Sequence, residues 1–137
     1  QYFWVNSILP ALCLKHFTPL LVNDSPACFA CLSAMVGSIS DNRLGGWYGY
    51  RASKAALNML IKTASVELAR TNKLASVIAV HPGTTSGTLS EPFTKNRDKS
   101  SVYPPNLTAD RIVNVCEQAP INSSGGLFNW NGERLAW

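Results

Sequence analysis

A tyrosine and a lysine four residues apart, Tyr50 and Lys54, are the residues whose types and spacing are best suited to chemistry. They lie in the stretch GGWYGYRASKAALNML, whose alanine-rich second half is typical of a helix. Side chains at i and i+4 of a helix lie one above the other, so the ammonium would favour the phenolate and lower a tyrosine pKa that starts near ~10. Such a tyrosine can exchange a proton with a substrate oxygen. The same spacing also occurs on ordinary helix surfaces, so its meaning depends on the surrounding elements.

Helices and short apolar strands alternate along the chain. The predicted elements, in order, are a helix to about Val22, a strand over Ala27–Ser33, a helix over Tyr48–Arg70, a strand over Ala75–Gly83, and a helix from a cap at Thr108 to about Gln118. The polar segment Thr84–Leu107 is expected to be a long loop or lid with little regular structure. Asn131-Gly132 indicates a hairpin turn near the end of the chain.

This alternation is typical of βαβ crossovers, in which helices cover both faces of a parallel sheet. The sequence therefore predicts an α/β fold of three strands with flanking helices, the C-terminal half of a Rossmann-like doubly wound parallel sheet. It contains no G-x-G-x-x-G turn after a first strand. Residues 1–137 are accordingly interpreted as a single incomplete domain that lacks the half binding the cofactor phosphates.

The composition fits a globular protein, with 46% hydrophobic and 15% charged residues. The net charge is +4, but the only local basic cluster is Lys95, Arg97 and Lys99, with Asp98 among them. A solvated loop explains this cluster better than a nucleic-acid surface does. We therefore expect no nucleic-acid partner.

The four cysteines are Cys13, Cys28, Cys31 and Cys116, and two of them form the C-x-x-C sequence CFAC. On the predicted strand, residues three apart point to opposite faces, so these two thiols would diverge. No second pair supplies metal ligands. Buried free thiols are the preferred interpretation, and they suit a reducing cytoplasm.

The first 22 residues, QYFWVNSILPALCLKHFTPLLV, are apolar enough to raise the question of a membrane helix. Polar residues and prolines, among them Asn6, Pro10 and Lys15, argue against one, and no signal-peptide pattern is present. We expect a buried helix and no membrane partner. Because the chain opens with Gln1 instead of methionine, we also expect it to be part of a longer protein.

The segments GSISDNRLGGWYGYRASKAALNML and HPGT, together with Asn6 in the preceding helix, resemble the C-terminal part of a short-chain dehydrogenase/reductase. Within that superfamily they are similar to the C-factor group, which contains the C-signal and sniffer-like carbonyl reductases. The resemblance runs over essentially all of the chain and covers a little more than half of a typical family member. The family's glycine-rich phosphate loop would precede residue 1.

The resemblance implies roles for six residues. Tyr50 matches the catalytic acid/base, and Lys54 matches the lysine that holds the nicotinamide ribose and lowers the tyrosine pKa. Asn6 matches the helix asparagine that supports a proton-relay water. The turn that packs on the nicotinamide ring corresponds to Pro82, Gly83 and Thr84.

Two positions depart from the family pattern. The serine that polarises the substrate carbonyl falls at Ala34, directly after Ser33. Ser38 or Ser33 could take its place, and Ser38 is favoured because Ser33 should point to the other face of the strand. A family threonine that contacts the cofactor falls at Gly87, next to Thr88.

The resemblance implies an NAD- or NADP-dependent oxidoreductase of the carbonyl reductase or alcohol dehydrogenase type, acting on a small carbonyl or alcohol substrate in the cytoplasm. By analogy with family dimers, a homo-oligomer would form through the helices around residues 5–22 and 48–70. The isolated 137-residue chain is expected to be inactive without the upstream half. The alternative is a truncated signalling or protein-binding fragment whose strand Ala27–Ser33 has an open edge.

Overall fold

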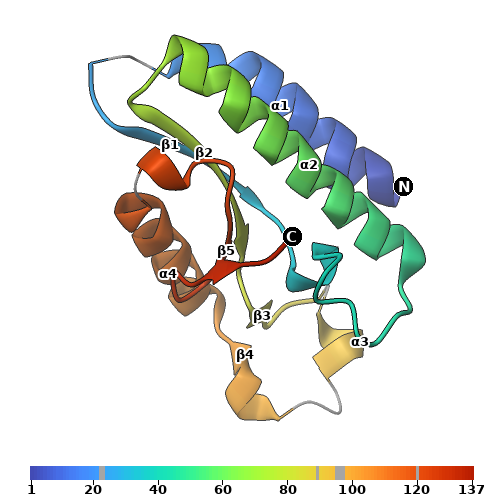
Figure 1. Cartoon of the computed structure of the whole chain (residues 1–137). Helices are drawn as coiled ribbons and strands as arrows, with labels where there is room; N and C mark the ends of the chain where they lie inside the picture. Colours follow the sequence, from blue (N-terminus) through green and yellow to red (C-terminus); the bar gives the residue numbers. More distant parts are fainter. Residues whose placement is uncertain (22–23, 89, 95–97, 120) are drawn as a thin grey trace.

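The computed structural model describes residues 1–21, 24–88, 90–94, 98–119 and 121–137. Within them, a sheet separates two layers of helices (Figure 1). Helices α1 (Leu9–Phe17) and α2 (Tyr48–Thr71) lie together on one face of the sheet, and α4 (Pro105–Gln118) lies on the other. The predicted α/β class, with helices on both faces of a parallel sheet, is confirmed.

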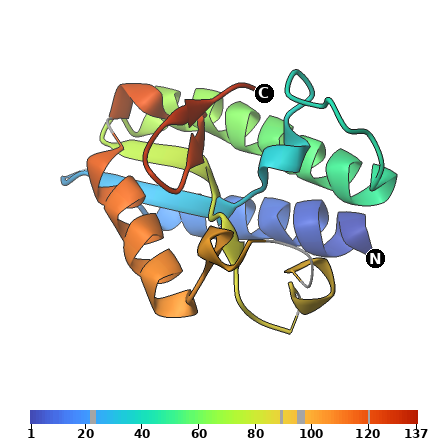
Figure 2. The same ribbon diagram turned by 90° about the horizontal axis from the view of Figure 1, so that it is seen from below.

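The main sheet has the strand order β1-β2-β5-β6 among the described residues. Strands β1 (Ala27–Leu32), β2 (Ala75–His81) and β5 (Leu127–Asn129) are parallel, while β6 (Arg134–Leu135) runs antiparallel to β5. Figure 2 shows β1 and β2 side by side, with the C-terminal hairpin beyond β2. The sheet thus has one short strand more than the three predicted. The extra strand follows from the predicted hairpin turn, where Gly132 has a φ of +85°.

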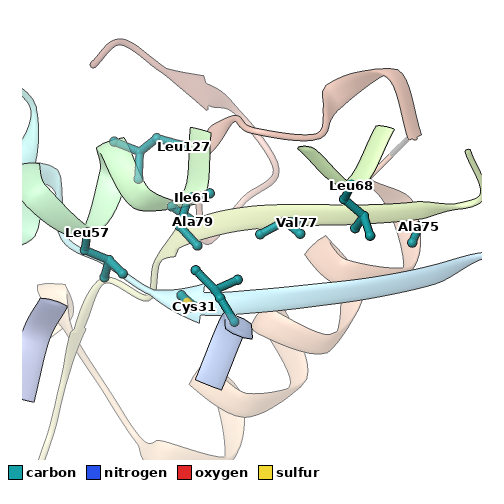
Figure 3. Close-up of a cluster of buried hydrophobic side chains, with 9 residues drawn as sticks. Cys31, Leu57, Ile61, Leu68, Ala75, Val77, Ala79 and Leu127 are labelled. Atoms are coloured by element: carbon teal, nitrogen blue, oxygen red, sulfur yellow. The ribbon is translucent and has the colours of Figure 1, made fainter. Parts of the chain in front are cut away.

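Strand β2 holds the fold together because its two faces belong to two different cores. Ala75, Val77 and Ala79 face α1 and α2, whereas Ile78 and Val80 face α4. The first core, drawn in Figure 3, is a cluster of small and branched side chains from α1, α2, β1, β2 and β5: Leu14, Cys31, Leu57, Ile61, Leu68, Ala75, Val77, Ala79 and Leu127. Its leucine and isoleucine side chains each stabilise the fold by about 1.5–3 kcal/mol on burial, and they fix α2 against the strands.

The N-terminal helical segment contains a π-helical turn, η1 (Trp4–Ile8), directly before α1. Pro10 lies in the first turn of α1, where a missing N–H costs little. After α1 the chain makes one 3₁₀ turn, η2 (Thr18–Leu20). The end predicted at Val22 lies outside the described residues.

The segment between β2 and α4 has more regular structure than the sequence indicated. Strand β3 (Thr84–Thr85) pairs in parallel with β4 (Val102–Tyr103), and the short helix α3 (Glu91–Thr94) and the 3₁₀ turn η4 (Lys99–Ser101) lie between them. The expectation of little regular structure is therefore wrong at both ends of the segment. Lys95 and Arg97 of the basic cluster lie outside the described residues.

Helix α4 begins at Pro105, three residues before the predicted cap at Thr108. A proline suits the first turn of a helix because its φ is already helical and its N–H would be unpaired there. Thr108 lies inside the helix, and its hydroxyl is 3.0 Å from the Thr85 hydroxyl of β3. The predicted cap is instead a link between α4 and β3.

All four cysteines are free, with Cys31 buried and the others half-buried. Cys31 belongs to the core under α1 and α2, and Cys28 packs against the core under α4, which confirms that the two thiols point to opposite faces. Among the described residues, no three acidic, histidine or cysteine side chains are grouped as a metal site would require. No described helix is both long enough and apolar enough to cross a membrane.

Candidate active site

Tyr50 lies in the first turn of α2, which follows a loop that ends on Trp47. Trp47 has a φ of +50° and is the only described non-glycine residue in the left-handed region. Arg51 stabilises this loop, because its Nε donates to the carbonyl oxygens of Gly45 and Gly46 at 3.2 and 3.1 Å. The start of α2, and with it the Tyr50 backbone, is therefore fixed by contacts from the helix back to the loop.

The Tyr50 ring is half-buried and lies beside Tyr2 of the N-terminal helical segment, with ring centroids 6.0 Å apart. Burial, and secondly Tyr2, raise the pKa of the Tyr50 hydroxyl above its ordinary value. The prediction that Lys54 lowers this pKa is therefore wrong for the chain without a cofactor. The reason is where the ammonium points.

Lys54 is buried one helical turn after Tyr50, and its Nζ donates to the carbonyl oxygen of Leu32 at 2.8 Å. This bond directs the ammonium toward the carboxyl end of β1. Burial lowers the pKa of Lys54, and nearby Cys31 opposes that change. Gly37 allows the chain after β1 to lie close to α2, because a Cβ at Gly37 would be only 2.8 Å from the Lys54 Cβ.

Asn6 lies in the π-helical turn η1, and its Nδ2 donates to the Ser53 hydroxyl at 3.0 Å. That hydroxyl donates in turn to the Tyr50 carbonyl oxygen at 2.8 Å. Ser7 adds a second link, since its hydroxyl donates to the Ser53 carbonyl oxygen at 2.8 Å. π-turns are frequent at functional sites, and this one connects the N-terminal segment to the turn of α2 that carries Tyr50.

The two candidate serines have different surroundings. Ser33 is buried and donates to Asn58 Oδ1 of α2 at 2.6 Å, so its hydroxyl is engaged with the helix. Ser38 is also buried, and its hydroxyl accepts the Asp41 backbone N–H at 3.2 Å within the loop after β1. Sequence reasoning missed Asn58, although it follows Lys54 by one turn on the same face of α2.

The turn Pro82–Gly83–Thr84 follows β2 and leads into β3. Gly83 has a φ of +78°, which favours glycine. A Cβ at this position would lie 3.1 Å from Trp130 Cδ1 and 3.4 Å from Tyr103 Cδ2, so the turn rests on two aromatic rings.

Gly87 and Thr88 are both exposed, downstream of β3. The segment that follows the turn is tied back at two points. The Ser86 backbone N–H donates to the Tyr103 carbonyl oxygen at 2.8 Å, and the Ser90 N–H donates to the Gly87 carbonyl oxygen at 3.1 Å.

The parallel strands with helices on both faces define a doubly wound α/β fold. Lys54 lies at the carboxyl end of β1, the customary place for a site in such a fold. Comparison with known proteins identifies the family within this fold class. The short chain dehydrogenase family profile matches residues 1–98, and the chain belongs to that family.

The relatives agree with this assignment. A 1-hydroxy-2-glutathionyl-2-methyl-3-butene dehydrogenase from Rhodococcus sp. (strain AD45) is 31% identical over 133 residues, which are 97% of this chain and 56% of that protein. The carbonyl reductase Sniffer of D. melanogaster is 27% identical with a TM-score of 0.83, over 98% of this chain and 55% of that one. An NADPH-bound carbonyl reductase from chicken fatty liver is 26% identical with a TM-score of 0.82, over the same shares. The resemblance to short-chain dehydrogenases and sniffer-like carbonyl reductases is thereby confirmed, and the chain spans about half the length of these relatives.

Proposed function

We propose that the protein containing this chain is an NAD(P)-dependent oxidoreductase that interconverts a small carbonyl compound and its alcohol. The observation that carries the proposal is the placement of Tyr50 and Lys54 on successive turns of α2, with the Lys54 ammonium buried against the end of β1. Similarity to a carbonyl reductase bound to NADPH supports the choice of cofactor class. NAD and NADP both remain within the proposal.

The residues present fit the nicotinamide end of such a cofactor. An ammonium has three N–H donors, and the bond to Leu32 uses one, so Lys54 retains donors for ribose hydroxyls. Gly83 has a left-handed backbone, and the absence of a Cβ lets the turn pack directly against the Trp130 ring. When bound, the nicotinamide supplies or accepts the hydride.

Within this proposal Tyr50 moves the proton. In the reductive direction its hydroxyl donates the proton to the carbonyl oxygen, and in the oxidative direction its phenolate accepts the proton from the alcohol. Lys54 holds the ribose, and it would stabilise the phenolate only when its ammonium turns from Leu32 toward Tyr50. Ser38 orients the substrate oxygen, and Asn6 supports the backbone of the Tyr50 turn through Ser53.

We also propose that the protein forms a homo-oligomer in the cytoplasm, through the helical segments at residues 5–22 and 48–70. Two observations support this surface. The exposed side chains of the N-terminal segment and α2 include many large apolar ones: Trp4, Val5, Ile8, Leu9, Leu12, Met59 and Val66. A groove of about 760 Å³ runs between α1 and α2, and Leu14, Leu60 and Ala64 contribute to its lining. A symmetric pairing of these helices would cover both.

The test is the variant Tyr50→Phe in the natural polypeptide, with NADH or NADPH oxidation followed against small aldehydes and ketones. Loss of the hydroxyl should reduce turnover by about 10²–10⁴-fold, the usual contribution of a general acid, with cofactor binding retained. Tyr48→Phe is the matched control, because Tyr48 lies on the same turn and is 87% exposed. Near-normal turnover by Tyr50→Phe would refute the role. A wild-type protein that binds neither dinucleotide would favour the alternative of a non-enzymatic signalling or protein-binding fragment.

A further inference from the structure

Arg111 lies between two aromatic rings that come from distant parts of the chain. Its Cζ is 4.1 Å from the Tyr103 ring centroid and 3.9 Å from the Trp130 ring centroid. The two rings are 5.5 Å apart and inclined by 57° to each other. The guanidinium therefore contacts both rings at once and joins α4, β4 and the end of β5.

The electrostatics of this contact explain how one buried nitrogen of Arg111 is stabilised without a hydrogen bond. Nη1 of Arg111 is buried and has no hydrogen-bond partner among the described residues. A buried donor without an acceptor is costly in most settings. Here the negative faces of Tyr103 and Trp130 take the place of an acceptor, and a planar guanidinium stacks on such faces better than an ammonium does.

The same two rings support the turn after β2. Gly83 packs directly on Trp130 and Tyr103, as the short distances from its missing Cβ show. Thr85 pairs with Tyr103 across β3 and β4. The Ser86 N–H donates to the Tyr103 carbonyl oxygen at 2.8 Å. Displacement of Tyr103 would therefore move both the turn and the strand that follows it.

We propose that Arg111 is a positioning residue, which clamps Tyr103 and Trp130 together and so holds the Pro82–Gly83–Thr84 turn in the geometry that receives the nicotinamide. The inference that the turn receives the nicotinamide rests on the proposed function, whereas the clamp itself does not. Arg111 touches neither substrate nor cofactor in this proposal. It acts through the two rings and the backbone of Gly83.

The clamp is tested first on the protein without cofactor, by amide hydrogen exchange at Ser86. Arg111→Met keeps much of the apolar length of the side chain but removes the cation, and it should speed exchange at Ser86 at least tenfold. Arg111→Lys should give an intermediate rate, because one ammonium cannot stack on two rings. Arg43→Met, which removes an exposed arginine from the loop before α2, is the control and should leave the rate unchanged. Equal Ser86 exchange in the wild type and Arg111→Met would overturn the clamp.

The positioning role is tested next by kinetics of the natural polypeptide. Misplacement of the turn should lower kcat of Arg111→Met by about tenfold or more, since small errors in reactant alignment have large effects on rate. The pH profile should stay unchanged, because Tyr50 and Lys54 are untouched, and Arg111→Lys should recover part of kcat. Faster exchange at Ser86 with a normal kcat would overturn the positioning role. A wild type without nicotinamide-dependent turnover would refute the proposed function instead, and the exchange measurement alone would then decide the clamp.

Discussion

Replacing Gly83 by alanine tests the turn after β2 most directly. Gly83 has a φ of +78°, and a left-handed conformation costs an L-residue about 1–2 kcal/mol. The new Cβ would also lie 3.1 Å from Trp130 Cδ1, so this ring must shift slightly, while Tyr103 Cδ2 at 3.4 Å stays in contact. Overpacking of this kind adds about 1–3 kcal/mol. We expect Gly83→Ala to lower the free energy of unfolding by about 2–5 kcal/mol, the sum of these two effects.

The matched control is Gly132→Ala in the β5–β6 hairpin. Gly132 has a φ of +85°, but no heavy atom lies within 4 Å of a Cβ placed there. This variant therefore carries the backbone cost alone, about 1–2 kcal/mol. Urea unfolding of both variants, followed by circular dichroism, gives the contribution of the rings as the difference between them. If the two variants lose the same free energy, Gly83 does not rest on the aromatic pair, and the reasoning about the turn fails.

Three further outcomes are expected. Ser33→Ala leaves the buried Asn58 Oδ1 without its 2.6 Å partner and should destabilise the protein by about 1–3 kcal/mol. Ser38→Ala should instead lower turnover more than it lowers stability. If the two substitutions had the same effects on turnover and stability, the choice of Ser38 would be contradicted. Burial raises the pKa of Cys31 to about 11, from 9.0, so the native state holds this proton more tightly and stability falls as pH rises from about 9 to about 11. The loss is on the order of 2–3 kcal/mol, and urea titrations should find a smaller loss in Cys31→Ala. Ser53→Ala removes the link from Asn6 to the Tyr50 turn, so it should reduce kcat with little change in cofactor affinity; a normal kcat would exclude a role for that link.

The helices and strands with strong local patterns were predictable from the sequence. Strand β2 is mostly apolar because it is buried on both faces, and such a strand needs no alternation to be identified. Helix α2 was predicted over Tyr48–Arg70 and extends over Tyr48–Thr71. The hairpin at Asn131-Gly132 follows from turn chemistry alone. In each of these cases the residues that determine the element lie within the element.

The errors concern features that depend on distant residues. Thr108 looked like a helix cap, but Pro105 already starts α4, and the Thr108 hydroxyl is free to reach Thr85 across the fold. The β3–β4 pair joins residues that are 18 positions apart in its register, Thr84 with Val102, and has no local signature. Arg111 was missed for the same reason, because its ring partners precede and follow it in separate elements.

The electrostatic error at Tyr50 shows what pairwise reasoning leaves out. Helical spacing places Lys54 one turn from Tyr50, but it does not determine where the ammonium points. In the folded chain the ammonium donates to Leu32, and burial dominates the pKa of both groups, raising that of Tyr50 and lowering that of Lys54. Burial thus favours the neutral form of each side chain. Within the proposed function, a neutral tyrosine is ready to give a proton in carbonyl reduction, whereas alcohol oxidation requires the phenolate and therefore a Lys54 ammonium drawn closer to it. Within the proposed function, Tyr50 therefore becomes an effective base only if the Lys54 ammonium turns from Leu32 toward the phenolate.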